Sequence, residues 1–155
     1  MSTDDLARPS IGSLQDRLTG FALPGGTCTI PAYEHWLAAD AMLSPELPPG
    51  QAHPLYIFYL ALLGMGVSID DLYALADTTV AEGPMLGETE LIQHRVLRVG
   101  TPYHVTGKIT GIERRTGRRI GVFDTMQARL ELSADLTVDD PAAVCANSFI
   151  IPRRT

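Results

Sequence analysis

His53 is the residue whose type and position best suit acid–base chemistry in this chain. It directly precedes Pro54, and the apolar residues that follow predict a helix from Pro54 to about Met65. Histidine has an unperturbed pKa of about 6.5, so it can give or take a proton near neutral pH. A histidine at this position can also cap the helix by bonding a nearby backbone group. The sequence leaves both roles open.

Asp40 is a second candidate, because it shares a helix face with apolar side chains. The segment from residue 31 to residue 43 predicts a helix whose apolar stripe consists of Tyr33, Trp36 and Leu37. Asp40 falls on that stripe near the helix C-terminus, where both burial and the helix dipole disfavour a negative charge. It is therefore either functional, for example by orienting His53 as a base, or placed at a frayed and hydrated helix end.

Asp124 is a third candidate. The segment from residue 119 to residue 132 alternates between apolar and polar residues, which predicts a strand. Asp124 lies on the apolar side of that alternation. Either a bulge near Phe123 turns the carboxylate outward, or Asp124 points into the protein as a catalytic carboxylate.

Four arginines gather in the sequence RRTGRR, from Arg114 to Arg119. The Arg115-Thr116-Gly117 segment predicts a hairpin turn, so these side chains are either simply solvated or bind phosphate. In the second case Arg115 and Arg118 would contact the phosphate groups of a bound ligand. The cluster is short and lacks interleaved aromatic residues, which argues against nucleic acid. The four histidines of the chain form no close pair, so no metal site is predicted.

The elements that must position these residues follow a simple order. A short helix over residues 11–18 and a short strand over residues 27–30 precede the helix that carries Asp40. After the central apolar helix, Gly64 and Gly66 predict a stop, and Ser68 predicts the cap of a second helix. The rest of the chain predicts four strands, over residues 88–99, 103–114, 119–132 and 144–151. The central helix has almost no polar face and is expected to be buried on nearly all sides.

Length and composition indicate one domain. The chain has 155 residues, a net charge of −6 and two cysteines without metal-type spacing. Residues 1–10 are polar and are expected to be disordered. They show no signal peptide, and the simplest interpretation is a reduced, cytoplasmic protein with no membrane or nucleic-acid partner.

The order of elements resembles a hot-dog fold, an α+β arrangement in which an antiparallel sheet wraps around one long helix. More specifically, the segments GQAHPLYIFYLALLGMG and ELIQHRVLRVGTPYHVTGKITGI resemble the MaoC-like dehydratase/hydratase family, and its non-catalytic N-terminal-type domains in particular. The resemblance extends over residues 18–153. It implies an acyl thioester of coenzyme A or acyl carrier protein as the substrate, with no further cofactor, and a pairing of two hot-dog units. On this resemblance, Arg115 and Arg118 would contact the phosphates of coenzyme A or a carrier-protein surface.

Catalytic members of that family have an Asp and a His in a D-x-N-P-x-H pattern before the central helix, and a helix N-terminus that polarises the thioester carbonyl. In this chain His35 falls near the family histidine, although its place toward the side of its helix also suits a solvent-facing residue. Five residues earlier stands Ile30 rather than Asp. The family dyad is therefore not present as such.

Three functions remain open on this basis. The first is reversible hydration and dehydration of an enoyl or 3-hydroxyacyl thioester, with a site drawn from His53, Asp40, Asp124 and His35. The second is a non-catalytic hot-dog subunit that pairs with a catalytic paralogue. The third is an acyl thioesterase with Asp40 or Asp124 as its base. A hot-dog unit exposes a sheet edge and part of its helix, so a homodimer or a heterodimer is expected.

Overall fold

The computed structural model describes residues 8–135 and 140–153. Its elements are, in chain order, α1 (Ile11–Leu18), β1 (Ala22–Thr29), α2 (Ala32–Ala41), α3 (Tyr56–Gly64), α4 (Ile69–Leu75), the 3-10 helix η1 (Val80–Glu82), β2 (Met85–Gln93), β3 (Pro102–Gly117), β4 (Gly121–Ser133) and β5 (Ala143–Pro152). The segment predicted to be disordered, 1–10, falls mostly on residues outside the described part of the chain.

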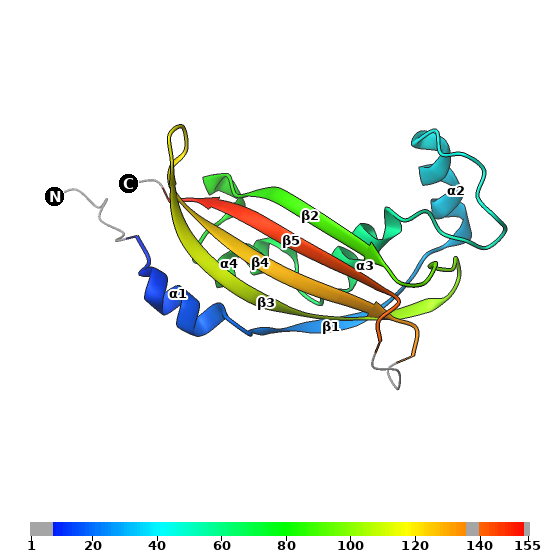
Figure 1. Cartoon of the computed structure of the whole chain (residues 1–155), viewed down its shortest axis with the longest axis horizontal. Helices are drawn as coiled ribbons and strands as arrows, with labels where there is room; N and C mark the ends of the chain where they lie inside the picture. The colour runs from blue at the N-terminus through cyan, green and yellow to red at the C-terminus, as the bar shows by residue number, and fades with distance from the viewer. Residues whose placement is uncertain (1–7, 136–139, 154–155) are drawn as a thin grey trace.

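The five strands form one antiparallel sheet in the order β1-β3-β4-β5-β2. The sheet curves around α3, which lies against its inner face together with α4 (Figure 1). The core consists of apolar residues from that face of the strands and from α3, for example Ile57 and Leu60, which are at most 1% exposed. The predicted α+β architecture, a strand, a helix and a central helix followed by four strands, is confirmed.

Gly64 and Ser68 set the end of α3 and the start of α4, respectively. Ser68 caps α4 as predicted, because its side chain accepts a hydrogen bond from the backbone N–H of Asp71. Gly64 ends α3 where the helix approaches the sheet so closely that a side chain there would collide with Val105. The absence of a side chain therefore allows α3 to pack against β3.

The central helix is buried on one side only, which corrects the prediction that it is buried nearly all round. Leu55, Tyr59 and Leu63 recur every four residues and are 47%, 51% and 60% exposed. They form one stripe along α3, opposite the face that packs on the sheet. We call these three residues the α3 stripe.

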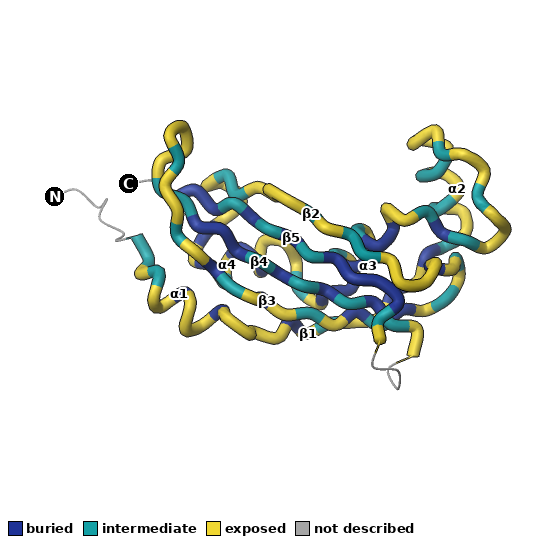
Figure 2. The backbone as a smooth tube through the Cα atoms, viewed as in Figure 1, coloured by how far each residue is buried: buried dark blue, intermediate teal, exposed yellow. Residues whose placement is uncertain are grey.

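The apolar stripe of α2 also faces away from the protein. Tyr33, Trp36 and Leu37 are each more than half exposed, and no residue of α2 is buried. His35, whose place in the sequence also suits a solvent-facing residue, is partly buried instead, and so is Glu34. Figure 2 shows α2 as an exposed element at one end of the molecule, away from the buried strands β4 and β5.

The hairpin between β3 and β4 is longer than predicted. Its turn consists of Arg118, Arg119 and Ile120 rather than Arg115 to Gly117, and β3 continues to Gly117. The hairpin projects at the end of the sheet opposite α2 (Figure 1).

Within the described residues, no single helix is both long and apolar enough to cross a membrane. Only α3 and α4 taken together reach that length and composition, and they are bent by 69° at the break between them.

Candidate functional site

The start of α3 brings two of the predicted site residues together. The backbone N–H of His53 donates a hydrogen bond to Nε2 of His35 at 2.9 Å. Nδ1 of His53 in turn accepts a hydrogen bond from the backbone N–H of Leu55 at 3.1 Å. His53 therefore fills the capping role at the helix start, and its Nδ1 is occupied by that contact.

The backbone donors at this helix start all have partners within the protein. Pro54 has no N–H, and the Leu55 N–H is bound to His53. The N–H groups of Tyr56 and Ile57 donate to the carbonyl oxygens of His53 and Pro54 at 3.0 and 3.1 Å. Between His53 and Ile57 no backbone N–H is left to polarise the carbonyl of a bound thioester.

His35 is held in a neutral, accepting state. Burial lowers its pKa below the ordinary histidine value, and the charge of nearby His53 lowers it further. The ring also lies 5.2 Å, centroid to centroid, from the ring of Tyr56. Because Nε2 accepts the His53 N–H, the proton of the neutral ring is assigned to Nδ1.

An apolar cavity of about 470 Å³ lies between α2 and the start of α3. Leu37, Ala38 and Met42 line it from the α2 side, and Leu55, Tyr56 and Tyr59 line it from α3. The remaining lining residue, Glu34, is the only charged one, and its carboxylate accepts a hydrogen bond from the hydroxyl of Tyr33 at 3.1 Å. We call this cavity the α2–α3 pocket. Its size and apolar lining suit a hydrocarbon group.

Asp40 lies on the other side of α2. It lines a second hollow of about 580 Å³, together with His35, Trp36 and the loop that leads to α3. Asp40 is exposed, and no hydrogen bond joins its carboxylate to either histidine among the described residues. His35 and Asp40 therefore share a surface hollow, but they are not assembled as an acid–base pair.

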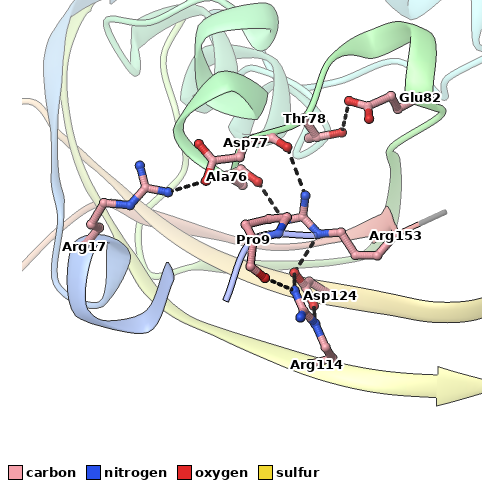
Figure 3. A network of polar contacts seen from close by, with 9 residues as sticks. All are labelled: Pro9, Arg17, Ala76, Asp77, Thr78, Glu82, Arg114, Asp124 and Arg153. Atoms are coloured by element: carbon pink, nitrogen blue, oxygen red, sulfur yellow. Dashed lines mark hydrogen bonds and ion pairs between the residues drawn. The ribbon is translucent and has the colours of Figure 1, made fainter. Parts of the chain in front are cut away.

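Asp124 points into the protein, which is the second of the two predicted alternatives, and the first, an outward turn through a bulge near Phe123, is wrong. The β3–β4 pairing is regular at this point, and Asp124 is fully buried. Its carboxylate accepts hydrogen bonds from Nε of Arg114 at 2.7 Å and from Nε of Arg153 at 2.7 Å (Figure 3). Although burial by itself raises the pKa of Asp124, the hydrogen bonds and charges of the two arginines outweigh it and hold the pKa below its usual value.

The two arginines connect Asp124 to distant parts of the chain. Arg153 also donates to the carbonyl oxygens of Ala76 and Asp77, at the end of α4, at 2.6 and 3.0 Å. Arg114 donates to the carbonyl oxygen of Pro9 at 2.9 Å. Figure 3 shows Arg114 and Arg153 meeting at Asp124, with their other contacts leading away to Pro9, Ala76 and Asp77. The cluster lies near the β3–β4 hairpin, at the opposite end of the sheet from His35 and His53, and its geometry is that of a structural clamp.

The predicted phosphate-binding arginines are also far from the histidines. Arg115 forms an exposed ion pair with Glu113 at 3.0 Å, and Arg118 is exposed in the hairpin turn. The structure does not bring either residue to the α2–α3 pocket. Within the described residues no group of three or more histidine, cysteine or acidic side chains is placed to hold a metal ion.

No family model and no curated protein matches this sequence. Similarity is found among solved structures. The ChsH1-ChsH2 complex from Mycobacterium tuberculosis matches with a TM-score of 0.65 at 13% identity, over 94% of this chain and 90% of that chain. The HadBC (3R-hydroxyacyl-ACP dehydratase) complex from the same organism matches with a TM-score of 0.63 at 12% identity, over 86% and 96%.

A monoamine oxidase regulatory protein from Archaeoglobus gives a TM-score of 0.61 at 12% identity, over 96% of this chain and 97% of that chain. At such low sequence identity, these TM-scores show that the fold is shared and nothing more. All three are hot-dog fold proteins, which agrees with the resemblance that the sequence suggested. The protein therefore has the hot-dog fold.

Proposed function

We propose that this chain is a non-catalytic hot-dog subunit that binds the acyl part of an acyl thioester and works in a pair with another hot-dog chain. The observation that carries this proposal is the start of α3, where every backbone N–H from His53 to Ile57 is already bound and where Pro54 has none.

Hydration of an enoyl thioester requires two things at the reacting atoms. The developing enolate oxygen needs a free hydrogen-bond donor, and a general acid–base pair contributes about 10²–10⁴-fold more. Ile30, at the place of the family aspartate, is fully buried and has no ionisable group. Both His53 Nδ1 and His35 Nε2 are used in structural hydrogen bonds. These features support binding without turnover over hydration by this chain alone.

Acyl binding is supported by the α2–α3 pocket. The pocket is lined almost wholly by apolar side chains and has the size of an ordinary small-molecule site. A hydrocarbon chain placed there would remove Leu37 and Tyr59, both more than half exposed, from water. The thioester carbonyl of such a ligand would gain no donor from the start of α3.

Pairing with another hot-dog chain is supported by two surfaces that this chain leaves open. The α3 stripe is exposed, and β2 is an edge strand whose one neighbour among the described strands is β5, so its outer edge carries unpaired backbone groups. Two of the similar solved structures are described as complexes, ChsH1-ChsH2 and HadBC. A catalytic partner would supply the acid, the base and the carbonyl donor.

Calorimetric titration of the purified chain with a saturated acyl-CoA and with free coenzyme A tests this proposal. We expect the acyl-CoA to bind at least about tenfold more tightly than coenzyme A, because only the former fills the apolar pocket. Equal affinity for the two ligands would contradict acyl binding. In parallel, loss of enoyl absorbance or release of thiol by the chain alone would contradict the non-catalytic role and favour a hydratase or a thioesterase, respectively.

A further inference from the structure

The open edge of β2 has a regular backbone over most of its length. Residues 88–93 pair one for one with residues 148–143 of β5, without a register shift. The other edge strand, β1, is interrupted by an irregularity between Leu23 and Gly26, and the N–H of Gly25 is bound to the carbonyl of Met65. The edge of β2 is therefore the one better suited to extend the sheet across a subunit interface.

Two glutamates occupy one face of this edge. Glu88 and Glu90 are both exposed and lie two residues apart, so they point to the same side of the sheet. Their neighbours on β5 are Ser148 and Ala146, which carry no charge. Neither glutamate forms an ion pair within the described residues, and the guanidinium of Arg129, on the next strand, is bound to Glu131 at 3.0 Å. The edge thus presents two uncompensated negative charges.

Pairing with a second copy would bring these charges together. In a two-fold antiparallel pairing of identical strands, the residue numbers that face each other add up to a constant. Centring the pairing on Thr89, the middle of Met85–Gln93, places Glu88 opposite Glu90 of the other copy. Centring it on Glu88 or on Glu90 places that glutamate opposite itself. All three registers oppose like charges, which destabilises a sheet.

We propose that the β2 edge selects a non-identical hot-dog partner whose own edge strand carries Lys or Arg opposite Glu88 and Glu90. This inference rests on the proposed pairing role and adds to it the chemistry of the partner. The apolar α3 stripe drives association with little selectivity, whereas the glutamates discriminate against self-pairing and favour a basic edge.

A charge-reversed copy of the chain serves as a probe for such a partner. The variant E88K/E90K repels itself as the wild type does, but in each of the three registers it sets a lysine opposite a glutamate of the wild type. We expect a one-to-one mixture of the two to associate at least about tenfold more tightly than either protein alone, as measured by sedimentation with fluorescently labelled chains. The advantage should shrink as salt is raised.

Two controls separate this effect from net charge and from loss of folding. D16K/D70K makes the same change in net charge at exposed sites outside β2, and its mixture with the wild type should associate no more tightly than the wild type alone. E88Q/E90Q removes the repulsion, so this variant alone should self-associate more than the wild type does. A wild-type homodimer that is insensitive to salt, or a mixture of wild type with E88K/E90K that is no tighter than its components, would overturn the inference. Acyl-CoA binding is measured separately, so either result leaves the acyl-binding part of the proposed function standing.

Discussion

The backbone N–H of His53 lies 2.9 Å from Nε2 of His35, and this hydrogen bond ties the start of α3 to α2. The contact joins two of the residues that the sequence singles out for acid–base chemistry, but it uses one as an acceptor for the backbone of the other. It also fixes α2 beside α3, where the two helices enclose the α2–α3 pocket. The histidine contact thus holds together the two helices that line the pocket.

Protonation of His35 should weaken this contact and make stability depend on pH. The pKa of His35 is lowered in the folded protein, so its contribution is fully present above the unfolded value of about 6.5 and is lost as the pH falls through the lower folded value. Replacing His35 by Gln keeps an acceptor oxygen and removes the titration. Denaturant unfolding from about pH 7 to about pH 5 should show a steeper loss of stability for the wild type than for His35→Gln. Parallel profiles would count against the contact.

Replacing Asp124 by Asn should destabilise the protein by about 3–5 kcal/mol, because it leaves the buried Arg153 without its counter-charge. Chemical denaturation measures this loss. The matched control is Glu113→Gln, which breaks the exposed ion pair with Arg115 in the same hairpin and should change stability by less than about 0.5 kcal/mol. An Asp124→Asn protein of wild-type stability would show that Asp124 is not a clamp, and would return it to the list of catalytic candidates.

Replacing His53 by Ala should remove the acceptor for the Leu55 N–H and cost about 0.5–2 kcal/mol, as the loss of other helix caps does. Asn at the same position has a side-chain oxygen that can accept from the backbone two residues on, so His53→Asn should retain most of the stability. Thermal unfolding compares the two variants. If they are equally destabilised, capping is not what His53 contributes.

Replacing Leu37 by Glu should place a charge in the α2–α3 pocket and weaken acyl-CoA binding by about tenfold or more. Leu37 is 55% exposed, so the fold should tolerate the change. Ala41→Glu adds the same charge to an exposed position of α2 outside the pocket lining and should bind like the wild type. Calorimetry with one saturated acyl-CoA compares the two variants. Equal affinities would show that the acyl group does not bind in the α2–α3 pocket.

Local chemistry in the sequence was sufficient to predict several elements. The apolar pair Leu14 and Leu18 marked α1, whose bounds agree with the predicted residues 11–18, and Ser68 marked the start of α4. The sequence predicts the hairpin turn three residues too early, because the Arg-Thr-Gly segment is typical of a turn but continues β3. With the turn at residues 118–120, the strand register puts Arg114 directly opposite Asp124. The ion pair between Arg114 and Asp124 therefore follows from the sequence once the turn is placed correctly.

The exposure of α2 and α3 could not be predicted in the same way. Periodicity shows that Tyr33, Trp36 and Leu37 share a helix face, but it does not show what covers that face. A stripe covered by another chain and a stripe covered by the protein's own sheet have the same sequence pattern. The contact of His53 with His35 was likewise hidden, since it depends on how the loop of residues 44–50 returns the chain to α2.

The measurement that most directly tests binding without turnover is incubation of an enoyl-CoA with an excess of the purified chain, following enoyl absorbance and free thiol together. An excess of protein makes even a single slow turnover visible. We expect the enoyl-CoA to bind while both signals stay constant, because residues 53–57 offer no free backbone donor and neither His35 nor His53 has a carboxylate partner among the described residues. Loss of enoyl absorbance without thiol release would instead establish a self-sufficient hydratase, and release of thiol would establish a thioesterase.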